Sequence, residues 1–190
     1  MKLENPIIRY LYELEKVVYD REWFKKSPNL ELYYMYRGIE TKEDLRYDIT
    51  VIPAKMLGVE FVKTLGHYHP DNYGELYIVL EGRAIYLMQK IDENGEIEDI
   101  YAVEAKKGAY VIIPPQYGHI TINPGNEALK MANWVCGDFK SVYDPIEEKK
   151  GGGYFYTNQG WIKNNNYANV PDLRMEAARD SMPEDLSFLR

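Results

Sequence analysis

The sequence predicts an all-β protein, a single jelly-roll β-barrel with a helix near its N-terminus and a short helix near its C-terminus. Most of the chain consists of short segments in which apolar and polar residues alternate, as they do in half-buried strands. Turn signals such as Glu81-Gly82 and Lys107-Gly108 separate these segments. Many short strands at this spacing favour a barrel or a jelly roll.

The expected elements follow the change of hydrophobic period along the chain. Apolar residues recur every three or four positions over residues 6–19, which predicts an amphipathic helix. From residue 30 the period shortens to two, and strands are expected at residues 30–37, 47–52, 59–64, 75–80, 84–89, 97–103, 109–114 and 128–135. Beyond Trp134, residues 151–153 and 164–166 are expected to form loops, and the tail from Pro171 a short helix.

Length and composition favour one domain. The chain has 190 residues, of which 45% are hydrophobic, and this suits a single buried core and excludes global disorder. No repeat or linker interrupts the chain. Residues 1–190 are therefore expected to form one domain, with the barrel over residues 30–145 and decorations at both ends.

Charge and hydropathy argue against two classes of partner. The net charge of −7, without a basic stripe, disfavours nucleic acid. No stretch approaches the roughly 20 apolar residues that span a bilayer, and the N-terminus lacks a signal-peptide pattern. Cys136 is the only cysteine and cannot form an internal disulfide. The expectation is a cytoplasmic protein that binds neither nucleic acid nor membrane.

The three histidines of the chain, His67, His69 and His119, all fall within two short motifs. His67 and His69 stand two apart on a segment expected to be extended, so both rings project to the same face. Glu75 begins the next predicted strand, and His119 follows the strand that ends at Pro114. Three imidazoles and one carboxylate suit Fe, Mn, Ni, Co, Cu or Zn. A metal site is the favoured interpretation, and the alternative is that the histidines are hydrogen-bonded core residues.

The two motifs resemble the paired motifs of the cupin superfamily. The matching positions are His67, His69, Glu75 and Gly82 in the first motif, and Gly108, Pro114, His119 and Asn123 in the second. Three features depart from the usual pattern. Five residues separate His69 from Glu75 where three or four are common, and Phe61 and Gln116 stand where glycines are common.

The wider gap is similar to that of the cupin-type glucose-6-phosphate isomerases of archaea, as are Thr64-Leu65-Gly66 ahead of His67 and Pro114-Pro115 ahead of His119. The similarity covers residues 30–145. It implies interconversion of open-chain glucose 6-phosphate and fructose 6-phosphate, with a proton moved between C1 and C2 through an enediol. It also implies one divalent metal ion per subunit, Fe²⁺ or Mn²⁺ first and Ni²⁺, Co²⁺ or Zn²⁺ next.

The same similarity implies roles for individual residues. The metal ligands would be His67, His69, Glu75 and His119. Glu75 is also expected to be the catalytic base, with Tyr77 on the same strand face relaying a proton or holding a hydroxyl. The implied phosphate contacts are Thr50, Thr64, the Gly66 amide and Tyr143. Without the resemblance, the two threonines would be interpreted as β-branched residues of strand interiors, and Tyr77 is equally compatible with simple packing.

Other functions remain compatible with the ligand set. An Fe(II)-dependent dioxygenase would need a largely apolar pocket, whereas 18 tyrosines favour a cavity suited to a sugar. A non-catalytic sugar-binding cupin would hold a sugar without converting it. A sugar-nucleotide epimerase of cupin form is disfavoured, since such enzymes need no metal. The segment 30–37 and the terminal helices are expected to join two subunits into a homodimer.

Overall fold

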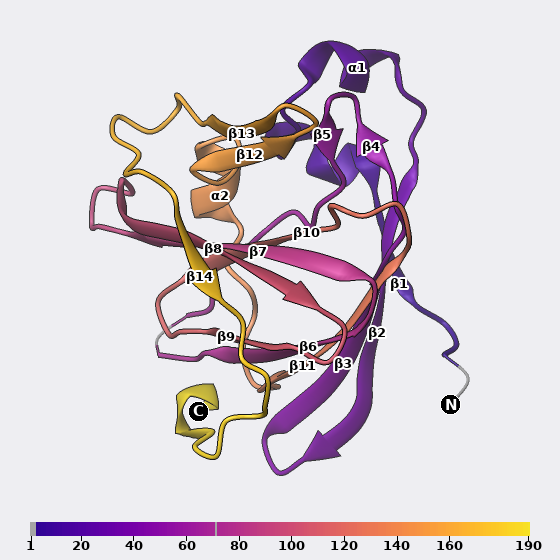
Figure 1. Cartoon of the computed structure of the whole chain (residues 1–190), viewed down its shortest axis with the longest axis vertical. Coiled ribbons are helices and arrows are strands. Elements are labelled where there is room, and N and C mark those ends of the chain that lie inside the picture. The colour runs from indigo at the N-terminus through magenta and orange to yellow at the C-terminus, as the bar shows by residue number, and fades with distance from the viewer. Residues whose placement is uncertain (1–2, 71) are drawn as a thin grey trace.

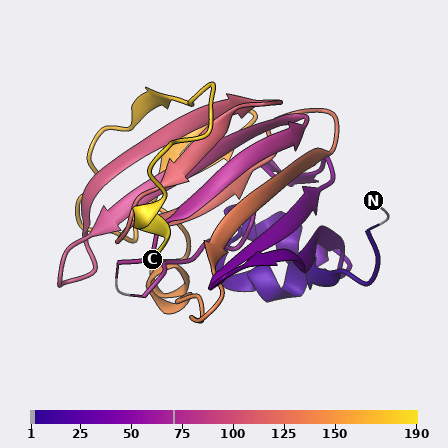
Figure 2. The same ribbon diagram turned by 90° about the horizontal axis from the view of Figure 1, so that it is seen from below.

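Two β-sheets face each other in the computed structural model, which describes residues 3–70 and 72–190 (Figure 1, Figure 2). In spatial order, the larger sheet contains β1 (Ile7–Tyr10), β2 (Glu31–Lys42), β3 (Leu45–Ile52), β11 (Leu129–Cys136), β6 (Glu75–Glu81) and β9 (Tyr110–Ile113). The second contains β10 (Gly118–Ile122), β7 (Arg83–Ile91), β8 (Ile97–Lys106) and β14 (Arg174–Ala177). From β8 to β11 successive strands alternate between the two sheets, which is the jelly-roll arrangement. The predicted all-β fold class is confirmed.

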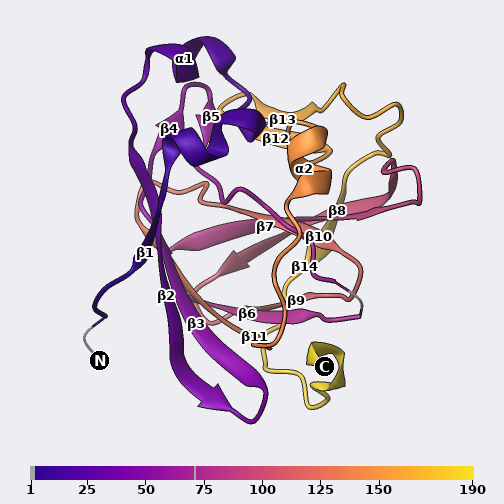
Figure 3. The same ribbon diagram turned by 180° about the vertical axis from the view of Figure 1, so that it is seen from behind.

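Smaller elements gather at one end of the two sheets (Figure 3). They include a third sheet of β13 (Gly160–Lys163), β12 (Tyr154–Thr157), β5 (Glu60–Phe61) and β4 (Met56–Leu57). The helical pieces at this end are the 3-10 helix η1 (Leu11–Val17), α1 (Arg21–Lys26) and α2 (Asp144–Glu148). The 3-10 helix η2 (Ser187–Leu189), near the C-terminus, lies at the opposite end (Figure 3). Among the described residues no helix is both long and apolar enough to cross a membrane.

The helix predicted over residues 6–19 is wrong. Residues 7–10 form β1, which pairs antiparallel with β2, and only η1 follows as a 3-10 helix. Leu11, Leu14 and Val17 are buried and stand three apart. A 3-10 helix has three residues per turn, so this spacing aligns the three side chains on one face. The same spacing resembles an α-helical pattern when it is seen in sequence alone.

The short helix predicted in the tail from Pro171 is also wrong in place and type. Residues 174–177 form β14, which pairs in parallel with β8, and all four residues are exposed. An amphipathic helix needs an apolar face to bury, and this segment buries none. Its main chain instead bonds to the free side of β8, and Arg174 forms an ion pair with Asp99. Within the described part of the tail, the helical turn is η2.

Several strands were not predicted, and one segment has a different environment from the one expected. The unpredicted strands include β10 at residues 118–122, and β12 and β13 at residues 154–157 and 160–163, between the two segments expected to be loops. The predicted strand over 59–64 is reduced to β5, with a further bridge between Lys63 and Ile122. Residues 31–35 pair with β1, and residues 34–36 also pair with β3, so residues 34 and 35 lie inside the sheet and offer no free edge to a second subunit.

The space between the sheets is apolar on one side and mixed on the other. β7 contributes fully buried side chains such as Met88 and Tyr86, whose hydroxyl contacts Met131 on the larger sheet. The inner face of the larger sheet also carries buried polar groups, which are Asp48, Thr50, Glu75 and Asn133. Buried polar groups are costly unless they find partners. Their concentration on one face therefore marks the place where the fold builds a site.

Candidate metal centre and its cavity

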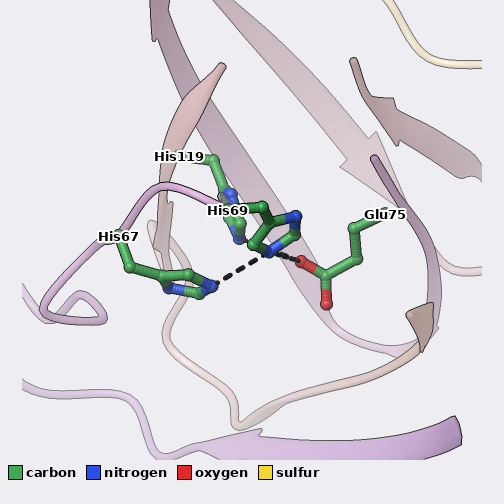
Figure 4. Close-up of side chains that lie close together, drawn as sticks. All are labelled: His67, His69, Glu75 and His119. Atoms are coloured by element: carbon green, nitrogen blue, oxygen red, sulfur yellow. Dashed lines mark hydrogen bonds and ion pairs between the residues drawn. The ribbon is translucent and has the colours of Figure 1, made fainter. Parts of the chain in front are cut away.

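The side chains of His67, His69, Glu75 and His119 converge on one point (Figure 4). Their ligand atoms all lie within 4.8 Å of one another. The Nε2 atoms of His67 and His69 are 3.2 Å apart. The Oε2 atom of Glu75 lies 3.3 Å from His69 Nε2 and 3.2 Å from His119 Nε2. The sequence prediction that these four residues meet is borne out by this geometry.

The main chain brings the two motifs together. His119 lies on β10, and His67 forms an isolated antiparallel bridge with it, with N–H to O=C distances of 3.2 and 3.0 Å. Gly66, directly before His67, has a φ of +85°, and a Cβ there would lie 2.5 Å from Ile120 Cγ1. Only glycine fits such a close, left-handed position. Gly66 thus lets the first motif approach β10.

The surroundings of the rings set their orientation and charge. His69 Nδ1 lies 3.2 Å from the Tyr73 carbonyl oxygen, a contact that fixes the ring and leaves Nε2 toward the centre. Burial lowers the pKa of His67 well below its usual value, and burial likewise lowers the pKa of His119. Burial alone would raise the pKa of Glu75, but the neighbouring His119 and His69 rings hold that pKa well below its usual range.

The donor set fits a divalent metal ion. Neutral imidazoles and a carboxylate are the protonation states that such an ion requires. Glu75 Oε2 is buried and has no hydrogen-bond partner, although it lies close to two ring nitrogens. A buried, unpaired carboxylate oxygen is costly. A cation held among the four ligand atoms would satisfy this oxygen and the facing nitrogens together.

All of the remaining site residues expected from the sequence line one cavity with these four. They are Thr50, Thr64, Gly66, Tyr77 and Tyr143. The cavity has a volume of about 70 Å³, room for a few water molecules. Side chains from both of the larger sheets form its wall. Phe139, which stacks on Tyr73 at 5.0 Å and lies 4.7 Å from the His69 ring, is part of that wall.

Tyr77 stands next to the metal ligands. Its hydroxyl lies 3.3 Å from His119 Nε2, and it shares the inner face of β6 with Glu75. Burial raises the pKa of Tyr77 well above its usual value, and the charge of Glu75 adds to this effect. The phenol is therefore protonated at neutral pH and can act as a hydrogen-bond donor.

One end of the cavity gathers hydroxyl groups around a guanidinium group. The Thr64 hydroxyl accepts from the Thr121 N–H at 3.0 Å, and the Tyr33 hydroxyl accepts from the Leu65 N–H at 3.2 Å. Arg9 on β1 pairs across the sheet with Tyr33, and its guanidinium carbon lies 5.9 Å from the centre of the Tyr143 ring. The sequence did not predict Arg9 at this site because residues 6–19 were expected to be helical. Tyr33 lies on a predicted strand, but the pairing of that strand with β1 was not predicted.

The opposite side of the cavity carries polar residues that the sequence prediction also missed. They are Arg37 on β2, Arg46 on β3, Asn133 on β11 and Ser141 beyond it. A signal existed, because Asp48 and Asn133 are polar residues in the middle of predicted strands. Among the lining residues, the charged groups other than the three histidines are three arginines and Glu75. The cavity is therefore cationic in a chain of net charge −7.

This fold, with its ligands supplied by two motifs on facing strands, defines the chain as a cupin with a candidate metal centre. Residues 11–172 match the family model of glucose-6-phosphate isomerase (GPI), and the chain belongs to that family.

The glucose-6-phosphate isomerase of Thermococcus kodakarensis is 31% identical over 151 residues, covering 76% of this chain and 77% of the relative. The enzyme of that name from Thermococcus gammatolerans is 30% identical over 148 residues, covering 75% and 76%. Among solved structures, an oxalate oxidase superposes with a TM-score of 0.48 at 16% identity, covering 64% of this chain and 58% of its own. This similarity to a solved structure gives no information about function.

Proposed function

We propose that this protein interconverts glucose 6-phosphate and fructose 6-phosphate with the help of one divalent metal ion per subunit. The observation that carries the proposal is the joining, in one cavity, of a His/Glu metal cluster and a set of hydroxyl and guanidinium donors suited to a phosphate. Membership of the glucose-6-phosphate isomerase family supports the choice of substrate.

The strand register supports an extended ligand that lies along the strands on the inner face of the larger sheet. Glu75 stands opposite Val135, which in turn stands opposite Arg46, whereas Thr50 stands opposite Met131. Thr50 is four residues along β3 from Arg46, which at about 3.4 Å per residue amounts to about 13 Å. An open-chain hexose phosphate can span this length, with its phosphate toward Thr50 and its carbonyl end toward the metal cluster.

The phosphate end is proposed to contain Thr50, Thr64, the Gly66 amide and Tyr143, as the family resemblance implies. Arg9, next to Tyr33 and Tyr143 at the same end, adds a guanidinium group to these neutral donors, and its Nη1 is ion-paired with Glu13 at 2.8 Å. A guanidinium group is well suited to phosphate, since it offers several N–H groups in one plane. The guanidinium group would attract the phosphate dianion locally, although the net negative charge of the whole chain repels that dianion.

The reacting end is proposed to use Glu75 as base and Tyr77 as donor. A metal ion bound by the four ligands would stabilise negative charge that develops on the substrate oxygens. Glu75 is deprotonated at neutral pH. A carboxylate bound to a cation is a weaker base, so Glu75 can accept the proton moved between C1 and C2 only if it binds the metal weakly or detaches from it. The protonated Tyr77 phenol can hydrogen-bond a substrate oxygen beside that carbon. The alternative for Tyr77 is that it only packs against His119 and Tyr86.

The finer expectations are part of this proposal. Fe²⁺ or Mn²⁺ is the expected metal, with Ni²⁺, Co²⁺ and Zn²⁺ as alternatives, because imidazole and carboxylate ligands suit all of them. The protein is expected to be a cytoplasmic homodimer that acts in glycolysis and gluconeogenesis, without a nucleic-acid or membrane partner. Sedimentation at the mass of a single chain would contradict the dimer.

A coupled enzyme assay tests the function. Purified, metal-loaded protein should produce fructose 6-phosphate from glucose 6-phosphate, and the reverse, without consuming oxygen. Oxygen uptake with Fe²⁺ and no interconversion would favour the dioxygenase alternative. Binding of the two sugar phosphates without interconversion, whichever of the five metals is supplied, would favour the sugar-binding alternative.

A further inference from the structure

The last residues of the chain cross from the second sheet to the larger sheet and end in η2 (Figure 1, Figure 3). After β14 the chain forms a bridge to β9, in which the main chains of Arg179 and Tyr110 exchange hydrogen bonds of 2.9 and 2.8 Å. Residues 179–190, the C-terminal strap, then lead to η2. We propose that this strap holds Glu75 in position as a ligand of the candidate metal centre. The proposal rests on the metal ion of the proposed function, but not on the reaction.

The strap is anchored on the outer face of the larger sheet. Leu189 is 0% exposed and belongs to a buried cluster with Leu76 on β6 and Leu45 on β3. Arg190 Nε donates to Asp44 Oδ1 at 2.9 Å, in the turn between β2 and β3. Segments outside the main sheets are usually mobile unless they are tied down, and the burial of Leu189 ties η2 to the barrel.

The strap also contacts the main chain directly before Glu75. The Gly74 N–H donates to the Phe188 carbonyl oxygen at 2.6 Å. A Cβ on Gly74 would lie 2.8 Å from the Ile113 carbonyl oxygen on one side, and 2.8 Å from both the carbonyl oxygen and Cδ2 of Phe188 on the other. Only a residue without a side chain permits such a close approach. β9 and η2 therefore hold Gly74 between them.

Glu75 is a ligand that needs support from outside its own strand. It is the first residue of β6, and strand ends open more easily than strand centres. Successive side chains of a strand point to opposite faces, so the contact between Leu76 and Leu189 lies directly behind Glu75. The Tyr73 carbonyl oxygen, two residues earlier, lies 3.2 Å from His69 Nδ1. Movement of this segment would displace two of the four candidate ligands.

The strap acts at a distance from the cavity. None of residues 179–190, all of which the structure describes, lines the metal cavity. The strap also lies beyond the part of the chain that matches the family model, which ends at residue 172. Its effect on Glu75 therefore passes through the main chain at the start of β6, and Phe188 and Leu189 are positioning residues.

Titration of the full chain with Mn²⁺, one of the two metals expected first, tests the proposal. Leu189→Ala and Phe188→Ala should each weaken Mn²⁺ binding by about 10- to 100-fold, the range typical of groups that only orient ligands. Leu189→Met conserves the buried volume and should bind Mn²⁺ as the wild type does. The control is Leu57→Ala, at a leucine of the third sheet that is also 0% exposed. It should destabilise the fold without weakening Mn²⁺ binding.

Hydrogen exchange in the metal-free protein gives a second measurement that needs no metal. The Gly74 amide should exchange at least about 10-fold faster in Leu189→Ala than in the wild type, because its bond to Phe188 opens locally. Leu57→Ala should not produce this local increase. If Leu189→Ala fails to fold, Phe188→Ala, at a side chain that is only partly buried, provides the same comparison.

The outcomes separate this proposal from the proposed function. Wild-type affinity for Mn²⁺ in both alanine variants of the strap would overturn the proposal, whatever the exchange rate at Gly74. An equal loss of affinity in Leu57→Ala would also overturn it, because general loosening would then explain the effect. If the wild type binds none of the five candidate metals, the metal centre and the role of the strap are refuted together. Weaker binding in the strap variants of a protein without isomerase activity would support the strap and refute the proposed function alone.

Discussion

The main chains of His67 and His119 are joined by two reciprocal hydrogen bonds, 3.2 and 3.0 Å long. These bonds connect the first histidine motif to the second directly, through an isolated bridge rather than through a long ladder. Each ring is thus positioned by the backbone of the other ligand segment. The candidate metal centre consequently depends on the packing of both sheets and not on either motif alone.

Removal of one ligand should release the metal. We expect His119→Ala to weaken metal binding by more than about 100-fold, since changes even to residues that only orient ligands cost about 10- to 100-fold. Competition with a chelator, read by elemental analysis, measures this. Gln116→Ala, at an exposed position near the same strand, is the matched control and should bind metal normally. Full metal occupancy in the His119 variant would show that the four residues are not the ligands.

Glu75→Gln should abolish proton transfer while it preserves the shape of the site. The expected loss in the rate of interconversion is about 10²-fold or more, measured at saturating metal. Tyr77→Phe removes one hydroxyl from the same strand face. It should reduce the rate of interconversion less than Glu75→Gln does if the phenol only assists the proton transfer. A Glu75→Gln enzyme that turns over nearly as fast as the wild type, with its metal bound, would transfer the role of base to another residue.

The stability of the metal-free protein should decrease in mild acid. Burial keeps the folded-state pKa values of His67 and His119 below the ordinary value of 6.5. The unfolded chain therefore binds more protons below pH 6.5, and folding loses up to about 1.4 kcal/mol per pH unit for each ring. The depressed pKa of Glu75 adds a further loss below its ordinary value of 4.5. Urea unfolding at a series of pH values measures this, and a free energy of unfolding that is flat or rises from pH 7 to 5 would contradict it.

Much of this site was predictable because it depends on local spacing. His67 and His69 are two apart, and this alone places both rings on one side of an extended segment. The cationic wall was not predictable in the same way. Arg37, Arg46 and Asn133 meet only because β2, β3 and β11 are neighbours in a particular register, and that register includes a bulge. Neither the order of strands nor a bulge is encoded by the alternation of residues within one strand.

The two errors in helix prediction have a common cause. In residues 6–19 the apolar spacing of three serves a 3-10 helix as well as an α-helix, and β1 precedes it. In the tail, the apolar residues of 171–178 suggested a helix, but the unpaired edge of β8 provides main-chain partners that outweigh local preference. Both errors arise where tertiary contacts decide between conformations of similar local stability.

A buried ion pair outside the site allows a test of the packing at the end of the barrel. The side chains of Glu60 and Lys63 are 1% and 4% exposed and are ion-paired, with Lys63 also donating to the Val17 carbonyl at 2.8 Å. Glu60→Gln should cost about 3–5 kcal/mol, because it leaves a buried positive charge without its counter-charge.

Chemical denaturation measures that cost. The double variant Glu60→Leu with Lys63→Met should recover most of it, because a buried pair can be replaced by apolar groups at little cost. A single variant as stable as the wild type would show that water reaches Lys63. Isomerase activity should be unaffected in the folded double variant, since neither residue lines the metal cavity.

The central proposal is that one cavity holds a divalent ion and that the sugar phosphate reacts beside this ion. The most direct test strips the metal from purified protein and restores Fe²⁺, Mn²⁺, Ni²⁺, Co²⁺ or Zn²⁺ in turn, with bound metal and the rate of interconversion measured on the same samples. We predict no activity without metal and a rate that rises in proportion to occupancy, up to one ion per chain. Full activity in protein with no detectable metal, or one bound ion per chain with no interconversion for any of the five, would contradict the account.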